Sequence, residues 1–600
     1  MSKATLEDFQ NLTSIHDLSV LLGFPAKKLS YILYKLKGGP NGQYTEFEIK
    51  KRSGATRSIA APNTGLKEVQ KRLSQKLQDI YWVKKSVHGF VGKRGILSNA
   101  TNHAQKRFVF NVDLKDFFPS IHFGRVLGLF SARPYQCPKD VAILLAKIAC
   151  YQDKLPQGSP CSPVIANMIC AYMDKQLSDL AKETGCYYTR YADDLTFSTN
   201  KLHFPEEIAN HTGIDWEVGN QLNEIVENNG FTINDDKTSM RTRSDRQLVT
   251  GIVVNDHPNI RRKTIKQIRA MLHDWKVNGL ENAQEKYVAS HDLNNRPESR
   301  EAIDFTKVVR GKIEHVRHVR NFRMGILNKI DQEEAIRNRA QYKRRAYQSF
   351  SHDQYYKYFE RFTQLIFRDC GSPVILGEGE TDWMHLRKAF ADLQRIGKFP
   401  DLKLHIHKHS KHANGGYTNL VDFCNNAKDL YVKFERPVIC VYDCDIPNVN
   451  KEHEGEKFIA HGNNVFSMLL QRPSHRKSEM YSIEQLYPNE DLQKKDKFGR
   501  RLFLSTEFNK KGIHKENPSW VYGKRASDGK EVSGVQKTLS GHEKVIDNAV
   551  CDSSNGKRIS VAMSKRDFAI KIMRMEYPFN EMDFSGFEDT FKIVEEICTR

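Results

Sequence analysis

The chain has 600 residues, which is too long for a single hydrophobic core, so two or more domains are expected. Hydrophobic residues make up 39% and aromatic residues 10%, which excludes global disorder. No apolar run approaches the ~20 residues of a membrane helix, and the N-terminus has no apolar signal core, so we expect a cytoplasmic protein. The formal charge of +20 favours a polyanionic partner.

In the first half of the chain, a predicted strand ends in an acidic residue. Residues 1–110 mix amphipathic helices with short strands. The apolar run Phe108–Val112 then predicts a strand, and Asp113 follows it directly. Residues 186–199 predict two short strands that are joined by a tight turn at Ala192-Asp193.

A basic helical region follows over residues 260–350, where Arg and Lys are frequent. Arg317, Arg320 and Arg323 recur every three residues, so they share one face of a helix. A solvated face and a face that follows nucleic-acid phosphates both fit this spacing, and the acidic residues discussed next favour the second.

A new pattern begins after a break at residues 370–373. It contains an apolar strand at Val374–Leu376, a turn at Gly377–Gly379, a helix from about Asp382, and a second apolar strand at Pro437–Tyr442. Strands that alternate with helices predict a parallel α/β domain. We therefore place the domain boundary at about 340–372.

Asp113, Asp193 and Asp194 form the first predicted metal site. Nucleotidyl transfer needs two divalent ions ~3.5–4 Å apart, and Mg²⁺ needs few carboxylates because phosphates and water complete its shell. An isolated Asp-Asp pair is usually a solvated turn. Here Tyr191 precedes the pair and apolar residues follow it, which favours two buried strands with both acids at the tip.

These segments resemble the catalytic motifs of reverse transcriptases. Residues 191–194 (YADD) resemble their catalytic box, residues 111–121 (NVDLKDFFPSI) their first catalytic motif, and residues 155–163 (LPQGSPCSP) their substrate-binding loop. The resemblance implies a right-hand polymerase with fingers, palm and helical thumb. It implies that Gln157, Gly158 and Tyr191 border the incoming nucleotide. Phe118 is then the steric gate that rejects a ribose 2′-hydroxyl and favours dNTPs, and a core phenylalanine is the alternative interpretation.

Two basic residues extend the resemblance. Arg57 matches the finger-strand residue that grips the triphosphate, and Lys237 matches the lysine of a later motif. A solvated basic residue is the alternative interpretation of each.

Three further elements narrow the match to retron reverse transcriptases, over roughly residues 20–320. They are residues 88–91 (HGFV), 99–103 (NATNH, an NAxxH element) and 249–251 (VTG). The family associates NAxxH with recognition of a structured RNA, which implies RNA-binding roles for Asn99 and His103, together with the three thumb arginines. Retron enzymes start DNA synthesis from a 2′-hydroxyl of an internal guanosine in their own non-coding RNA, and they leave a branched RNA–DNA hybrid called msDNA.

A second acidic set follows two predicted strands of the C-terminal region. Glu378 comes directly after the first strand, and Asp443 and Asp445 follow the second at a spacing that points both side chains the same way. Ligand sites form at strand ends in open α/β sheets, so these three residues predict a site for one or two Mg²⁺ ions. The alternative is a helix-capping acid and an unrelated loop.

This set resembles the Toprim domain of topoisomerases, primases and OLD-family nucleases, and residues 378–382 (EGETD) look most like the OLD form. The resemblance implies a Rossmann-like fold in which Asp382 and Glu484 complete a second metal site. It also implies that Lys565 stabilises charge on the scissile phosphate. Ordinary surface charge is the alternative interpretation of each of these three residues. No GxxxxGK[ST] loop precedes this region, so the polymerase stands where OLD nucleases carry an ATPase.

A histidine-rich stretch, LHIHKHSKH, contains His405, His407, His409 and His412. Alternation along a strand would place the first three on one face, as metal ligands require. We favour instead an edge strand that runs into a polar loop.

The sequence therefore predicts a multidomain α+β and α/β protein of bacterial cytoplasm. Its expected parts are polymerase fingers and palm (1–255), a basic thumb (256–340), a linker (341–372) and a Toprim nuclease domain (373–600). The expected cofactor of both domains is Mg²⁺, with Mn²⁺ as a substitute. The expected partners are the cognate RNA, its msDNA, dNTPs and a nucleic-acid substrate of the nuclease. No membrane association is expected. Regulation of an effector favours a homo-oligomer.

Retrons act against phages by restraining a toxic effector, so the fused nuclease is the expected effector. Two alternatives stay open. The C-terminal half is a non-catalytic module that docks msDNA or a partner, or the polymerase belongs to a group II intron or a diversity-generating element. The NAxxH and VTG elements disfavour both the group II intron and the diversity-generating element.

Overall fold

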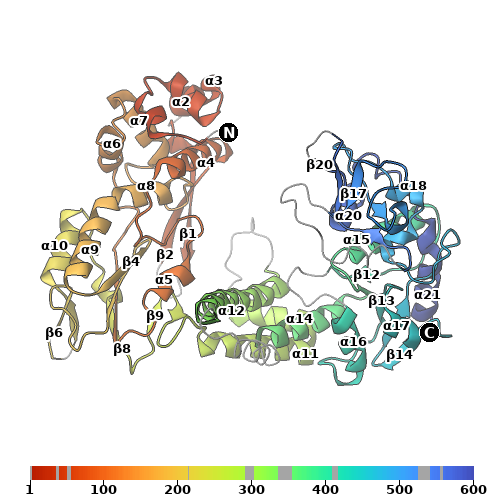
Figure 1. The fold of residues 1–600 in the computed structure, drawn as a ribbon. Helices are drawn as coiled ribbons and strands as arrows, with labels where there is room; N and C mark the ends of the chain where they lie inside the picture. Colours follow the sequence, from red (N-terminus) through yellow and green to blue (C-terminus); the bar gives the residue numbers. More distant parts are fainter. Residues whose placement is uncertain are drawn as a thin grey trace. The chain divides into compact units, whose positions relative to one another are not determined.

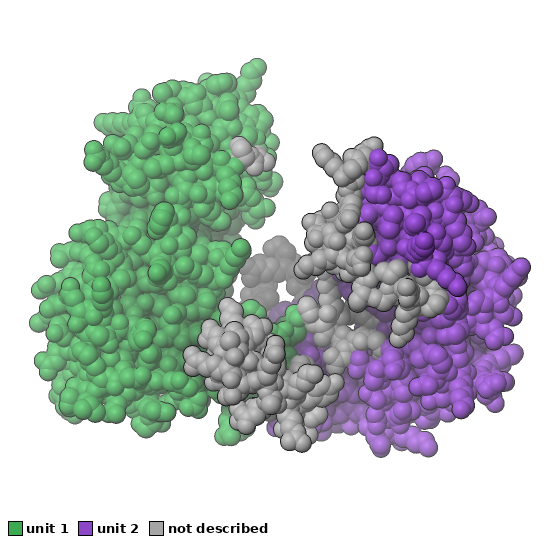
Figure 2. Space-filling model, in the orientation of Figure 1, with its two compact units in different colours: residues 1–266, 314–345 green, residues 267–313, 346–600 purple. Residues whose placement is uncertain are grey.

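The computed structural model describes residues 3–35, 39–50, 56–213, 215–290, 303–335, 354–408, 417–523, 541–554 and 559–600. The chain divides into two compact units (Figure 2), Met1–Lys266 with Glu314–Arg345 and Gln267–Ile313 with Ala346–Arg600. Among the described residues, no helix is long and apolar enough to cross a membrane.

The first unit contains a four-stranded antiparallel sheet in the order β4-β5-β3-β8. Figure 1 labels two of its strands, β4 and β8. The strands are β3 (Phe108–Asp113), β4 (Tyr187–Tyr191), β5 (Asp194–Thr199) and β8 (Ser239–Thr242). The predicted strand before Asp113 and the predicted strand pair around Ala192-Asp193 are thus confirmed. Because β5 pairs with both β3 and β4, Asp194 lies opposite Asp113 on one side and Tyr191 on the other.

Both faces of this sheet are covered. Tyr188 and Arg190 of β4 reach Asp174 of α9 (Ala171–Glu183) on one face. The intervening Thr189 points the other way, where it contacts His103, just after α5 (Ile96–Thr101). The other helices of this unit are α1 (Leu6–Gln10), α2 (Ile15–Leu22), α3 (Ala26–Ser30), α4 (Thr64–Ile80), α6 (Phe123–Ser131), α7 (Lys139–Ala149), α8 (Ser162–Ile169) and α10 (Asn220–Asn228).

Three short antiparallel pairs complete the first unit. Their strands are β1 (Tyr44–Lys50) with β2 (Thr56–Pro62), β6 (Ala209–His211) with β7 (Trp216–Val218), and β9 (Leu248–Val249) with β10 (Ile252–Val253). The largest core of the unit includes Phe110, Leu195 and Phe197, which are fully buried.

The expected linker at 341–372 contains a packed helix, α14 (Gln354–Asp369). Tyr358, Phe362 and Leu365 of α14 are buried, and Trp275 of α11 (Arg262–Ser290) donates a hydrogen bond to Asp369 at 2.6 Å. Residues 267–313 therefore belong to the second unit. The boundary falls within α11 and α12 (Phe305–Ala335) rather than at 340–372.

The second unit is built on a five-stranded sheet in the order β12-β11-β13-β15-β14. Its strands are β11 (Val374–Gly377), β12 (His405–Ile406), β13 (Val438–Tyr442), β14 (Ile459–Gly462) and β15 (Val465–Leu469). All described pairings are parallel except that of β14 with β15. The helices α15 (Asp382–Arg395) and α16 (Tyr417–Asn425) lie between strands in the chain, so the predicted alternation of strands and helices is confirmed.

Shorter elements fill the rest of the second unit. They are α17 (Pro447–Glu452), α18 (Asn489–Leu492), α20 (Lys565–Arg574), α21 (Glu588–Cys598), β16 (Phe503–Leu504), β17 (Trp520–Tyr522), β18 (Val545–Ile546), β19 (Val550–Asp552) and β20 (Ile559–Ser560).

Candidate active sites

Three carboxylates meet at one end of the central sheet of the first unit. Asp113 ends β3, its register partner Asp194 begins β5, and Asp193 occupies the turn before β5. Leu114 donates its N–H to the Asp193 carbonyl at 3.0 Å, which joins the two segments. Burial and the neighbouring acids Asp193 and Asp113 raise the pKa of Asp194 to about 7. The three residues predicted to act together are therefore placed together.

The turn that carries these acids packs closely against Gly89 and Arg190. Ala192 has φ 58°, in the left-handed region. A β-carbon at Gly89 would lie 2.4 Å from the Ala192 nitrogen, so only glycine fits against this turn. Asn167 donates to the Gly89 carbonyl at 3.0 Å, and the buried Arg190 donates to the Ala192 carbonyl at 3.0 Å. This close packing explains the glycine of the HGFV element.

Lys237, predicted from a later motif, lies in this site. Its Nζ is 2.6 Å from Asp113 Oδ1, and Asn234 donates to the same oxygen at 3.1 Å. Arg57, on β2, is exposed, and its charge acts to lower the pKa of Asp193 against the raising effect of burial. Both predicted basic residues are therefore within electrostatic reach of the acids.

The predicted substrate-binding loop lies against β2. Ala60 donates its N–H to the Gln157 carbonyl at 3.0 Å. Gly158 has φ 132°, and a β-carbon there would lie 2.5 Å from the Ala60 carbonyl oxygen, so the close approach requires glycine. The Oε1 atom of Gln157 is buried, and no partner for it lies within the described residues. Phe118 is half-buried, with its ring 6.0 Å from that of Phe90.

The NAxxH element lies in the protein interior, which corrects the expectation that it contacts RNA. His103 and Asn99, expected to contact RNA, are both fully buried. The ring nitrogens of His103 lie 2.7 Å from Thr189 Oγ1 on β4 and 2.7 Å from Ser198 Oγ on β5. Burial lowers the pKa of His103 to about 3, so the ring is neutral. His103 thus braces both strands of the catalytic hairpin from within. The amide of Asn99 is buried and has no hydrogen-bond partner among the described residues.

The VTG element forms the turn of the β9–β10 hairpin. Thr250 and Gly251 have φ values of 46° and 83°, the conformation of a two-residue turn of the primed type. The Thr250 hydroxyl donates to the carbonyl of Ile96, the first residue of α5. The VTG turn therefore contacts the first residue of the helix that carries Asn99.

The thumb arginines are only partly described. Arg317 is half-buried and pairs with Glu314 at 2.6 Å on the same helix. Arg320 is half-buried and donates to Asn321 at 2.9 Å. The side chain of Arg323 lies outside the described residues. Val316 and Val319 form the packed face of α12 beside them.

The second acidic set gathers at the carboxyl end of β11 and β13. Glu378 follows β11, and the backbone N–H of Asp443 donates to its carboxylate at 3.4 Å. Burial and the charges of Asp382 and Asp445 raise the pKa of Glu378 to about 7. Burial, with Asp382, Glu484 and Asp445, raises the pKa of Asp443 well above its usual range. The predicted acids therefore share one crowded end of the sheet.

Asp382 shapes the loop that precedes it. A β-carbon at Gly377 or at Gly379 would lie 2.6 Å from its side chain, and Gly379 donates its N–H to Oδ2 of Asp382 at 2.5 Å. The two glycines around Glu378 are thus required by the aspartate that begins α15. One oxygen of its carboxylate accepts from this backbone, and the role of Asp382 as a second metal ligand stays a prediction.

Glu484 and Lys565 form a second close contact at this end of the sheet. Lys565, the first residue of α20, lies 2.9 Å from Glu484, which also accepts a hydrogen bond from Ser482 at 2.7 Å. Burial acts to raise the pKa of Glu484, but the charges of Lys565 and His385 lower it to about 2. The glutamate is therefore an anion that is already paired with the predicted lysine.

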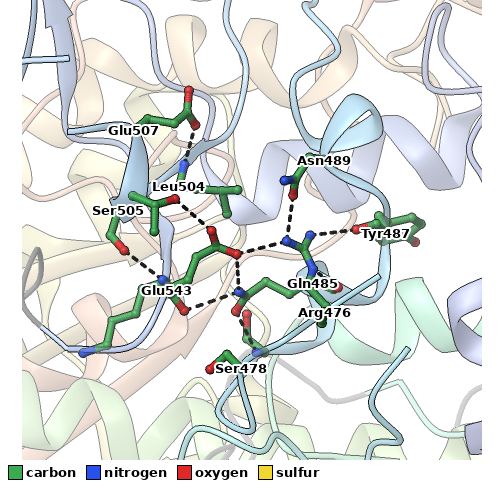
Figure 3. A network of polar contacts seen from close by, with 12 residues as sticks. Arg476, Ser478, Gln485, Tyr487, Asn489, Leu504, Ser505, Glu507 and Glu543 are labelled. Carbon is green, nitrogen blue, oxygen red and sulfur yellow. Dashed lines mark hydrogen bonds and ion pairs between the residues drawn. The ribbon is translucent and has the colours of Figure 1, made fainter. Parts of the chain in front are cut away.

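A polar network that the motifs did not reveal holds the segment around Glu484. Figure 3 shows the Arg476 guanidinium among Asn489, Tyr487 and Glu543. Arg476 donates to the carbonyls of Gln485 and Tyr487 at 2.8 and 2.9 Å, and it pairs with Glu543 at 3.0 Å. Neither Arg476 nor Glu543 stands in a recognisable motif, so only long-range contact information could have revealed them.

The histidine-rich stretch begins at a sheet edge, as expected. His405 is in β12, the outer strand beside β11, and the His407 ring packs edge-on against Phe367. His409 and His412 lie outside the described residues.

Neither acidic set forms a complete metal-binding cage. Among the residues that the structure describes, no three His, Cys, Asp or Glu side chains are placed to hold a metal ion by themselves. Lysines occupy part of each set, at Asp113 and at Glu484. The donor chemistry still fits Mg²⁺, which takes few carboxylates together with water and phosphate oxygens, and crowded acids with raised pKa values favour a bound cation.

Comparison with known proteins agrees with the polymerase geometry. Residues 49–289 match the family model described as "Reverse transcriptase (RNA-dependent DNA polymerase)". The retron Mx162 reverse transcriptase of Myxococcus xanthus is 35% identical over 46% of this chain and 61% of its own length. The retron Ec86 reverse transcriptase of Escherichia coli is 31% identical over 44% of this chain and 78% of its own length.

Among solved structures, a telomerase from Candida albicans in complex with a fragment of telomeric RNA aligns with a TM-score of 0.27 at 12% identity. The alignment covers 54% of this chain and 63% of the telomerase chain.

The fold and the acids at its hairpin tip define a reverse transcriptase. More narrowly, the chain belongs to the retron reverse transcriptase family, since it spans more than two thirds of the Ec86 enzyme. It spans less than two thirds of the Mx162 enzyme. The family match ends at residue 289.

Proposed function

We propose that the first unit is an RNA-directed DNA polymerase that copies its own structured RNA into msDNA. The pairing of Asp113 with Asp194, beside Asp193, carries this proposal because it brings three acids from two chain segments to one strand end. Mg²⁺ held by these acids would lower the charge barrier to attack by the primer hydroxyl on the nucleotide phosphate.

The surrounding residues suit a dNTP. Arg57 and Lys237 supply positive charge for the phosphates, and residues 157–158 lie against β2, the strand that carries Arg57. Phe118 blocks a 2′-hydroxyl at the sugar. The RNA is held by groups other than Asn99 and His103, which are buried in the protein.

Sequencing of the nucleic acid that co-purifies with the protein tests this function. The expected product is a branched RNA–DNA hybrid, and Asp193→Asn removes its DNA part. Asp179→Asn, an exposed acid on α9, is the matched control and leaves the product unchanged. Unbranched DNA would contradict the retron assignment, and DNA from Asp193→Asn cells would contradict the polymerase site.

We propose further that the second unit is a Toprim-like, metal-dependent nuclease, the effector in anti-phage defence that msDNA restrains. The supporting observation is the convergence of Glu378, Asp443 and Asp445 with Lys565, whose ammonium is attracted to Glu484, Asp443 and Asp445. Mg²⁺ at Glu378 and Asp443 would polarise a phosphodiester, and Lys565 would then stabilise charge on its oxygens.

Removal of msDNA tests the restraint. The msDNA-free protein is expected to degrade DNA or RNA with Mg²⁺ or Mn²⁺, whereas the complex is not. Glu378→Gln abolishes both this cleavage and phage protection, whereas Asp401→Asn, at an exposed acid, keeps them. Unchanged protection by Glu378→Gln would favour the alternative of a non-catalytic docking module.

A further inference from the structure

Phe90 has a backbone conformation that a bulky side chain rarely adopts. Its φ is 60°, in the left-handed region, and its side chain is 43% exposed. A left-handed aromatic residue is an outlier that the surrounding structure must impose. An exposed apolar ring gains little from burial. Neither feature is explained by the stability of the fold.

The neighbouring backbone fixes where this residue lies. Residues 86–88 run parallel to β4: Arg190 donates its N–H to the Ser86 carbonyl at 2.8 Å, and His88 donates to the Arg190 carbonyl at 2.9 Å. Gly89 then packs directly on Ala192. Phe90 is the next residue, so it lies beside the turn that carries Asp193.

The Phe90 ring lies beside the predicted steric gate. Its centroid is 6.0 Å from that of Phe118, with the ring planes tilted by 43°. The Phe118 ring in turn lies 5.4 Å from the buried ring of Phe117. The row of rings therefore runs outward from the core, and Phe90 is its exposed end.

We propose that Phe90 provides a stacking face for a nucleobase at the polymerase site, beside the ring of Phe118 that reads the sugar. The base belongs to the incoming nucleotide or to the template nucleotide that pairs with it. Aromatic side chains bind bases in this way with little sequence preference. The proposal rests on the polymerase function proposed above.

Phe90→Gly tests the proposal because it separates stability from function. Glycine adopts φ 60° without strain, so this variant should unfold at the same or a higher temperature than the unchanged protein. Loss of stacking should lower kcat/KM for dNTP incorporation by roughly tenfold. Phe90→Tyr keeps the ring and should stay within about threefold. Phe498→Leu, at an exposed phenylalanine of the second unit, is the matched control.

The assay uses the full chain, a DNA primer annealed to an RNA template, and single dNTPs. A raised KM for dNTP with unchanged affinity for the primer–template assigns the ring to the incoming base. Weaker primer–template binding in the absence of dNTP assigns it to the template base. If Phe90→Gly incorporates dNTPs as the unchanged protein does, the proposal is overturned. If the unchanged protein makes no DNA, the polymerase function itself fails.

Discussion

Arg190 and Asp174 form a doubly hydrogen-bonded ion pair from which water is excluded. Arg190 Nε lies 2.8 Å from Asp174 Oδ1 and Nη2 lies 2.7 Å from Oδ2, and both side chains are 0% exposed. The same guanidinium donates to the Ala192 carbonyl and to Asn167. The pair therefore ties α9 to the turn that positions the catalytic acids.

Asp174→Ala should destabilise the first unit by about 3–5 kcal/mol, because it leaves a buried guanidinium without its counter-ion. Urea unfolding measures this loss. Asp274→Ala is the control, since Asp274 pairs with Lys286, whose side chain is 71% exposed; it should change stability by less than about 1 kcal/mol. Equal effects of the two substitutions would show that the buried pair is not a brace.

Phe118→Val should admit ribonucleotides. The smaller side chain leaves room for a 2′-hydroxyl, so the preference for dNTP over rNTP should fall by at least about tenfold, on the scale of one steric contact. Competition between dNTP and rNTP on a primed RNA template measures the ratio. A preference that is unchanged would remove Phe118 from the role of gate.

His103 should make the first unit sensitive to acid. Burial lowers the pKa of His103 to about 3 in the folded protein, whereas the unfolded chain binds a proton near pH 6.5. Folding stability from this residue is therefore present above pH 6.5 and is lost as the pH falls toward 3. The difference in unfolding free energy between the unchanged protein and His103→Gln should decrease by about 2 kcal/mol when the pH is lowered from 7 to 5. A difference independent of pH would contradict a neutral ring.

Substitutions at Lys565 and Glu484 should distinguish a stabilising role of this ion pair from a role in the nuclease reaction. Lys565→Met leaves the buried Glu484 carboxylate without its partner and should destabilise the second unit by about 3 kcal/mol. The double variant Lys565→Met with Glu484→Gln should recover most of that loss, since no unpaired charge remains. It should nevertheless lack nuclease activity. Recovery of cleavage in the double variant would exclude a chemical role for this pair.

The central parts of both units were predictable because they depend on local patterns. The apolar residues around Asp193 and Asp194 indicated the hairpin, and the acid after each buried strand indicated where the side chains gather. Strand ends bring such residues together whatever the intervening chain does. The contact of Lys237 with Asp113, 124 residues apart, came instead from resemblance to a family.

The direction in which a polar side chain points was not predictable in the same way. NAxxH has the composition of a binding motif, yet His103 points into the sheet. The linker expected at 341–372 was a missed amphipathic helix, since Tyr355, Tyr358, Phe362 and Leu365 recur at helical spacing. Arg476 and Glu543 are joined by a contact across 67 residues, which no local pattern encodes.

A substitution at Gly89 would disturb the polymerase site without replacing any of its acids. One added methyl group would push against the Ala192 nitrogen and shift the hairpin tip while all three carboxylates remain chemically unchanged. A Gly89→Ala allele would therefore silence copying without altering the charge of the protein. It would show in living cells which effects of this chain depend on newly made DNA and which need only the folded polypeptide.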